Sequence, residues 1–202
     1  MPEPAYSRLD VDERRRQLLE LGRELFAEHS YDELSMAAIA RAAGISKALL
    51  YHYFHSKQAF FQATLAAAAE QVRELTEPDP NLPPAEALRV SLDAYLGWIE
   101  RNQLAYTKLI QGATSHAEVR VLIDQIRDAT SARIVEGMAA GRPVPPLARA
   151  AVRAWLWYMD GACMDWAEHG DYTREQLRDL LLGTLLGALV AAGAGELVAA
   201  GA

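Results

Sequence analysis

Four side chains between positions 47 and 52 have the chemistry and the spacing of a surface that contacts nucleic acid. Lys47, Ala48, Tyr51 and His52 share one outward arc of a helix, because residues three and four apart lie on the same side. Lysine can reach a guanine edge or a phosphate, alanine permits close approach or meets a thymine methyl, and histidine can donate to either. The pattern predicts non-covalent reading of a DNA groove.

The stretch that carries these residues predicts two short helices joined by a glycine turn. Ser35 and Ser46 each stand where a helix N-cap is expected, and Gly44 separates the two helical patterns. In the second pattern Leu50 and Phe54 are four residues apart and can pack inward, away from the outward arc. Two helices of this kind form a helix-turn-helix unit, whose second helix enters the DNA major groove.

The rest of the chain predicts further helices. Alternation with period two never persists, and Ala, Leu, Glu and Arg dominate throughout. The expected fold class is therefore all-α. The prolines of residues 78–84 break the helical path and mark a domain boundary. Besides the two short helices, we expect helices over residues 10–30, 56–77, 84–101, 103–112 and 116–140, beyond 146 to 169, and from 171 or 173 onward.

The charge of the chain is unevenly distributed. The formal net charge is -7; residues 1–57 carry 8 Lys+Arg and 9 Asp+Glu (net -1), which leaves 12 and 18 (net -6) for residues 58–202. This balance argues against a protein that coats nucleic acid by bulk electrostatics. Any phosphate contact should therefore be local and come from the N-terminal part.

Cysteine content and hydropathy favour a cytoplasmic protein with no membrane partner. The first 16 residues lack an apolar run of the signal-peptide type, and Cys163 is the only cysteine. The longest uncharged window, residues 180–195, has 16 residues. A bilayer helix needs roughly 20 apolar residues, so this window predicts a buried helix instead.

The segment from about residue 12 to residue 65 resembles the TetR/AcrR family of bacterial transcriptional regulators. The resemblance implies a three-helix helix-turn-helix DNA-binding domain at residues 1–57, with a fourth helix, 56–77, as connector. It implies a larger helical domain at residues 78–202 that binds a small-molecule effector and dimerises. The most specific matches are Ile39-Ala40, Ala43-Gly44-Ile45-Ser46, Leu50-Tyr51, Tyr53-Phe54 and Ser56-Lys57.

The resemblance also implies a function and a set of DNA contacts. A homodimer of this kind binds a palindromic double-stranded operator and, as a repressor, is released when a small, largely apolar effector binds. Three positions depart from the family pattern: Ala48 stands where glycine is most common, Leu49 where a small or hydroxylated residue is common, and Ala37 where some members use arginine to read a base. The family's base and phosphate contacts fall on Ser35, Ala37, Ser46, Lys47, Ala48, Tyr51, His52 and Lys57.

Candidate effector contacts in the larger domain rest on aromatic and polar side chains at helical spacing. Trp98, Tyr106, Trp155 and Met159 suit an apolar pocket, although the same stripe also suits plain core. Asp160 lies within the apolar run WLWYMDGACMDW. It either binds a cationic or hydroxylated effector or pairs with an arginine such as Arg120 or Arg127.

Two other classes of protein compete with the regulator. An enzyme is disfavoured, because the sequence has no Gly-x-Ser-x-Gly elbow, His-Glu-x-x-His helix, phosphate loop or dinucleotide fingerprint. No cofactor or metal is expected for the same reason. A helical interaction module that has lost DNA binding is the other alternative. Cys163 has an apolar neighbourhood, which favours a packed thiol over a redox switch.

Overall fold

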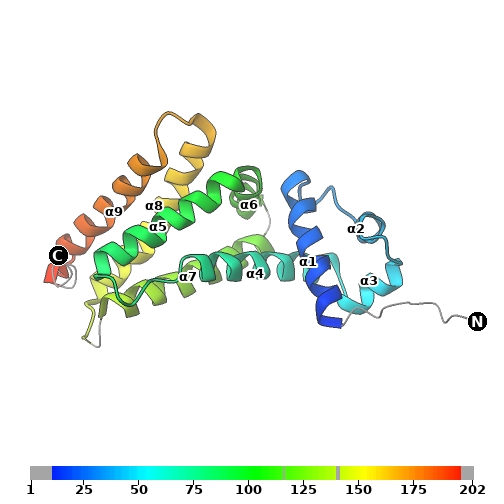
Figure 1. Cartoon of the computed structure of the whole chain (residues 1–202), viewed down its shortest axis with the longest axis horizontal. Coiled ribbons are helices and arrows are strands. Elements are labelled where there is room, and N and C mark those ends of the chain that lie inside the picture. The colour runs from blue at the N-terminus through cyan, green and yellow to red at the C-terminus, as the bar shows by residue number, and fades with distance from the viewer. Residues whose placement is uncertain (1–10, 116, 140–141, 197–202) are drawn as a thin grey trace, which may run out of the picture. The chain divides into compact units, whose positions relative to one another are not determined.

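The computed structural model describes residues 11–115, 117–139 and 142–196. Every regular element in these ranges is a helix, which confirms the predicted all-α class (Figure 1). Asp10, predicted to open the first helix, lies outside the described residues. The helices are α1 (Val11–Glu28), α2 (Met36–Ala42), α3 (Lys47–Tyr53), α4 (Lys57–Leu75), α5 (Pro84–Arg101), α6 (Gln103–Ser115), α7 (Ala117–Ala139), α8 (Pro146–His169) and α9 (Arg174–Ala191).

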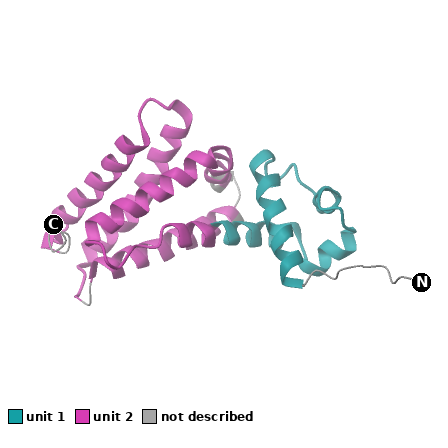
Figure 2. Cartoon of the chain, in the orientation of Figure 1, with its two compact units in different colours: residues 1–68 teal, residues 69–202 magenta. Residues whose placement is uncertain are grey.

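The chain divides into two compact units, residues 1–68 and residues 69–202 (Figure 2). The first contains α1 to α3 and the start of α4, and the second contains the end of α4 and α5 to α9. The division thus falls inside α4, the helix that the sequence predicts to be a connector. No helix among the described residues has both the length and the apolar content that crossing a bilayer requires.

Side chains at the predicted positions cap four of the helices; Ser56, before α4, accepts from the amide of Ala59 at 3.0 Å. The hydroxyls of Ser35 and Ser46 accept hydrogen bonds from the amides of Ala38 (3.2 Å) and Leu49 (3.1 Å). Thr173 opens α9 with a complete capping box. These bonds satisfy amides that a helix leaves unpaired in its first turn, which is why the helices begin where they do.

A cluster of phenylalanines forms the centre of the first unit. Phe60 of α4 is fully buried, and its ring lies 5.0 Å from the ring of Phe54, which follows α3. Phe61 meets Phe26 of α1 edge to face at 4.6 Å. Leu50 of α3 is also fully buried in this unit. The inward face of α3 is therefore fixed by packing, and its opposite face must point to solvent.

Helix α9 packs on α8 and α5 in the second unit, and one side of it belongs to the core of that unit. Its Leu177, Leu181, Leu185 and Leu189 repeat every four residues and are at most 1% exposed. Trp155 of α8 donates from its indole nitrogen to the carbonyl of Leu181 at 2.9 Å, so this buried polar group is satisfied. We call these four residues of α9 the leucine stripe.

Candidate nucleic-acid interface

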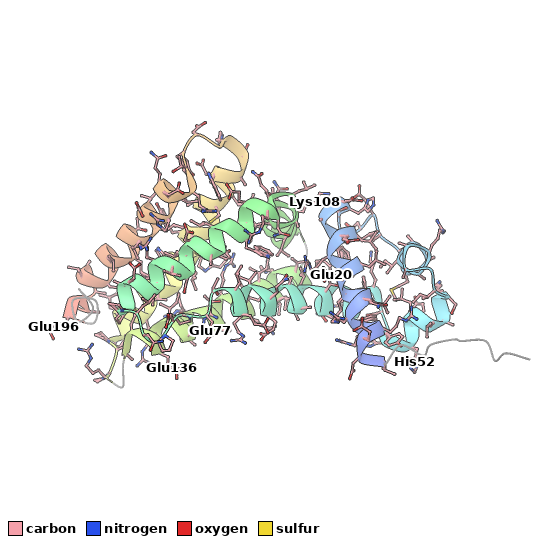
Figure 3. The ribbon with its side chains drawn as sticks, in the orientation of Figure 1. Glu20, His52, Glu77, Lys108, Glu136 and Glu196 are labelled. Atoms are coloured by element: carbon pink, nitrogen blue, oxygen red, sulfur yellow. The ribbon has the colours of Figure 1, made fainter. Side chains whose placement is uncertain are left out.

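Helix α3 divides into a buried side and an exposed side along the predicted line. Leu50 is 0% and Phe54 2% exposed. The predicted contact residues on the other side, which we call the outward arc, all lie at the surface; one of them, His52, is labelled in Figure 3. The outward arc consists of Lys47, Ala48, Tyr51 and His52.

Two of these side chains lie together on one flank of α3. The ammonium nitrogen of Lys47 is 5.7 Å from the ring centroid of Tyr51, a cation–π distance. The ring of His52 meets Tyr53 edge to face at 5.5 Å. A positive charge, a phenolic hydroxyl and an imidazole are thus presented within two helical turns. Each can bond to a phosphate oxygen or a base edge.

The predicted contacts at the start of α2 and α3 are exposed. The Ser35 and Ser46 hydroxyls accept from amides of their own helices, which leaves each hydroxyl proton free to donate outward. Ala37 lies in the first turn of α2, also exposed, and offers only its methyl group and close approach. The two serines therefore combine a helix cap with a donor that suits a phosphate oxygen.

Lys57 differs from the other predicted contacts because it has a partner inside the first unit. Its ammonium donates to the carbonyl of Tyr31 at 3.0 Å and lies 4.1 Å from the Tyr31 ring centroid. The side chain is only half-buried. Lys57 thus ties the start of α4 to the loop after α1, and it keeps two ammonium protons for other acceptors.

The turn between α2 and α3 requires a glycine. Gly44 has φ +65°, and nothing lies within 4 Å of a β-carbon built there. Its amide donates to the backbone carbonyl of Arg41 at 3.1 Å, and the amide of Ile45 donates to the backbone carbonyl of Ala40 at 3.0 Å. These bonds terminate α2. Gly44 is the residue in the left-handed conformation that commonly follows the C-terminus of a helix. The turn sets the direction in which α3 leaves α2.

The candidate effector residues all belong to the core of the second unit or pack against it. Tyr106 and Trp155 are 4% exposed, Met159 and Asp160 are 9% exposed, and Trp98 is half-buried. The sequence left two roles open for Asp160, and the structure shows the pairing with an arginine. Arg127 of α7 makes this contact, with its Nε donating to Asp160 Oδ2 at 2.8 Å.

Asp160 is the centre of a small buried polar cluster. The hydroxyl of Tyr106 donates to its other oxygen, Oδ1, at 3.1 Å. Arg127 also bonds to Asp124 at 2.9 Å and stacks on the ring of Trp157, 3.8 Å from its centroid. Burial raises the pKa of the Tyr106 hydroxyl far above its usual value. The carboxylate is therefore held by two donors, as a buried charge requires.

Cys163 is buried one helical turn after Met159. Burial, followed by the negative charge of Asp160, raises the pKa of its thiol to about 12. The thiolate is the reactive form of cysteine, so this thiol is unreactive near neutral pH. The geometry fits the packed role that the sequence favours.

An open depression of about 590 Å³ lies on the outer side of α8 and α9. Around it, Tyr158 is 42% and Leu180 49% exposed, although both are large and apolar. Trp157 and Val190, on the same two helices, are 59% and 63% exposed. This face, defined by these four side chains and called the outer α8–α9 face below, lies apart from the leucine stripe.

Two family descriptions match most of the chain. Residues 18–64 match "Bacterial regulatory proteins, tetR family", and residues 84–187 match "Tetracyclin repressor-like, C-terminal domain". The chain belongs to the TetR family. The family consists of transcriptional regulators that bind DNA, which confirms the predicted class and the prediction that the chain is not an enzyme.

Relatives of this TetR-family chain include both a repressor and an activator. It is 30% identical over 145 residues to the HTH-type transcriptional repressor Rv1474c of Mycobacterium tuberculosis, covering 62% of this chain and 75% of that protein. It is 31% identical over 109 residues to the HTH-type transcriptional activator FasR of Mycolicibacterium smegmatis, covering 52% of this chain and only about half, 49%, of FasR. A tetR-family regulator of Streptomyces coelicolor, 25% identical, superposes with a TM-score of 0.79 over 95% of this chain and 88% of the other.

In this TetR-family chain, the sequence did not predict that Leu49 of α3 lies at the surface. Leu49 is 38% exposed, although an apolar residue beside Leu50 reads equally well as core. Its exposure follows from the burial of Leu50 and Phe54, because successive residues turn by about 100° and only one side of α3 faces inward. Once Leu50 and Phe54 are assigned to the core, the helix geometry predicts that Leu49 is exposed.

Proposed function

We propose that this TetR-family DNA-binding regulator is a ligand-responsive repressor. In this proposal it acts in the cytoplasm as a homodimer, binds a palindromic double-stranded operator through α3, and leaves the operator when a small, largely apolar effector binds the second unit. The observation that carries the proposal is the outward arc of α3, which presents Lys47, Tyr51 and His52 to solvent while Leu50 is fully buried behind them.

The outward arc supports operator binding by its composition. A helix that reads the major groove needs small and polar side chains toward the bases and cations or hydroxyls toward the phosphates. Ala48 provides the close approach, and Lys47 and His52 provide donors. Ser35 and Ser46 provide flanking hydroxyl protons. These contacts together account for both affinity and register.

The outer α8–α9 face supports the homodimer. Trp157, Tyr158, Leu180 and Val190 are each 42% or more exposed, whereas the leucine stripe is buried. Tyr158 and Leu180 line one open depression, and exposed apolar side chains that gather on two packed helices suit an interaction site. A second copy that presents the same face would bury it around a two-fold axis, as most homodimers do. Two copies of α3 would then address two half-sites about one helical turn or a little more apart.

The core of the second unit supports an effector that is largely apolar. Tyr106, Trp155 and Met159 belong to one apolar core, and Tyr106 and Arg127 both donate to Asp160 at its edge. A small-molecule site usually combines apolar walls with a few such polar groups. We propose repression as the mode because Rv1474c, matched over 75% of its length, is named a repressor.

The test selects duplexes from the genome that encodes the chain. Purified protein is mixed with genomic fragments at low salt, bound fragments are sequenced, and the dissociation constant of each is measured by fluorescence anisotropy. We expect a symmetric consensus and a steep loss of affinity with salt. A reporter driven by the bound promoter should rise in activity when the gene is deleted. Failure to enrich any duplex would leave the chain as a helical interaction module, and lower reporter activity would make it an activator.

The effector is tested on the same complex. A panel of apolar small molecules is screened for those that lower the anisotropy of protein bound to its consensus duplex. Release by at least one apolar compound supports the proposal. Release only by hydrophilic compounds would contradict the class of effector, and a Met159→Ala variant, which removes apolar surface from the core, should weaken the response to a true effector.

A further inference from the structure

Helix α3 exposes an aliphatic side chain that the proposed DNA contacts do not use. The described residues of the first unit expose three large hydrophobic side chains: Val11 (59%), Leu49 (38%) and Tyr51 (41%). Two of them lie on α3, a helix of seven residues. Tyr51 has a hydroxyl that can meet a phosphate, but Leu49 has no polar group. Covering its exposed part with an apolar group of the DNA would remove that surface from water, which is favourable.

The position of Leu49 on α3 is next to Ala48 and away from the charged flank. At about 100° per residue, Leu49 lies on the opposite side of Ala48 from Tyr51. Lys47 accompanies Tyr51 on that other side, where its ammonium is 5.7 Å from the ring centroid. Helix α3 therefore has a polar flank, formed by Lys47 and Tyr51, and a second flank on which the apolar Ala48 and Leu49 of the first turn are followed by His52 one turn later.

The chemistry of the major groove leaves one partner for an apolar side chain. Every base presents hydrogen-bonding groups there, and thymine alone adds a methyl group, at its C5 position. A leucine placed over a G·C pair would remove water from polar atoms without replacing their hydrogen bonds. The same leucine over a thymine methyl buries apolar surface on both sides.

We propose that Leu49 is a specificity-determining residue that reads the 5-methyl group of a thymine in each half-site. This inference rests on the proposed operator binding and adds a base preference to it. Ala48, the shorter neighbour, allows Leu49 to approach the base edge. We therefore expect a required thymine at the operator position that Leu49 covers. Lys47 and Tyr51 contact the DNA from the other flank of α3.

The experiment removes the methyl group alone. In the selected consensus duplex, each thymine is replaced in turn by deoxyuridine, which keeps every hydrogen-bonding atom. Binding of the full chain is measured by fluorescence anisotropy. For the natural chain, we expect deoxyuridine at one or two positions of a half-site to weaken binding roughly 3- to 5-fold for each methyl lost. At the same positions, Leu49→Ala should bind thymine and deoxyuridine equally.

A matched variant separates Leu49 from a general loss of apolar surface. Leu75, the last residue of α4, is 43% exposed, so Leu75→Ala makes the same chemical change at similar exposure. We expect Leu75→Ala to keep the full deoxyuridine penalty. Circular dichroism checks that both variants are folded.

The possible outcomes distinguish a failure of the Leu49 inference from a failure of the proposed operator binding. Loss of the deoxyuridine penalty in Leu49→Ala alone supports the inference. An equal penalty in Leu49→Ala and the natural chain overturns it, because another residue then reads the methyl. A duplex that binds tightly with no deoxyuridine penalty at any position also overturns it, while operator binding stands. Absence of binding to every duplex overturns operator binding itself.

Discussion

Gly22 of α1 faces Thr64 of α4 so closely that a β-carbon added to Gly22 would lie 2.5 Å from Thr64 Oγ1. Thr64 is 1% exposed, and its hydroxyl donates to the carbonyl of Phe60 at 2.9 Å, so the side chain is held in place. The same β-carbon would also lie 2.8 Å from Phe60 Cζ. The close packing of α1 on α4 therefore depends on the missing side chain at position 22.

Replacement of Gly22 by alanine should destabilise the first unit. Overpacking of a filled core typically lowers the free energy of unfolding by about 1–3 kcal/mol. Gly137, within α7, is exposed and has nothing within 4 Å of a built β-carbon. Gly137→Ala should instead raise that free energy by about 0.5–1 kcal/mol, because glycine is a poor helix former. Urea unfolding followed by circular dichroism measures both; equal stability of the two variants would contradict the packing.

Removal of the charge at Lys47 should weaken DNA binding. If Lys47 meets a base, Lys47→Gln loses about 1–3 kcal/mol and relaxes the preference at one position. If it meets only phosphate, binding falls uniformly across sequences and the salt slope drops by about 1. Salt titration of the consensus and of a scrambled duplex separates the two cases. Lys108→Gln, in the second unit, removes the same charge and should bind as the natural chain does.

Loss of the Asp160 carboxylate should destabilise the second unit. Asp160→Leu leaves the Arg127 guanidinium, whose side chain is 13% exposed, without its buried partner. Breaking a buried ion pair from one side costs about 3–5 kcal/mol. Because Arg127 keeps Asp124 at 2.9 Å, we expect the lower end of that range. The double variant Arg127→Met, Asp160→Leu should recover most of the loss, and a double variant no more stable than Asp160→Leu would count against the pairing.

Cys163 should resist alkylation in the folded chain. Because the pKa of its thiol is raised to about 12 from an ordinary 9.0, almost no thiolate exists at pH 8, and the side chain is buried. We expect iodoacetamide to label the urea-unfolded chain many times faster than the folded chain, as followed by mass spectrometry. Fast labelling of the folded chain would contradict the buried position.

The same pKa predicts a loss of stability in base. The folded state holds the Cys163 proton more tightly than the unfolded state, since its pKa lies above the ordinary 9.0. The stability linked to this proton is complete below about pH 9 and declines as the pH rises toward 12. Urea midpoints of the natural chain and of Cys163→Ala across this pH range measure the effect, and the variant should decline less steeply.

Features set by neighbouring residues could be predicted from the sequence. Ser35 and Ser46 accept bonds from amides three residues away, so a short pattern suffices to locate the starts of α2 and α3. The burial of Leu50 and Phe54 follows from a spacing of four. By contrast, the predicted end of the sixth helix at Gly112 was wrong. Helix α6 continues to Ser115, because one glycine lowers helix stability by only about 1 kcal/mol.

Features set by distant residues could not be predicted from the sequence. Asp160 and Arg127 are 33 positions apart, and the sequence offered Arg120 equally well. Lys57 donates to the carbonyl of Tyr31, 26 positions away, a partner that no local pattern indicates. Such contacts depend on how helices pack, which spacing along one helix does not determine.

The leucine stripe fills the inner side of α9, whereas Leu180 and Val190 on its other sides are 49% and 63% exposed. In the proposed homodimer, with a second copy over the outer α8–α9 face, folding and association would be coupled, and the thermal midpoint would rise with protein concentration. Dilution would then unfold the protein as well as dissociate it. The amount of this protein that a cell synthesises would then determine both the occupancy of the promoter and the fraction of the protein that escapes degradation.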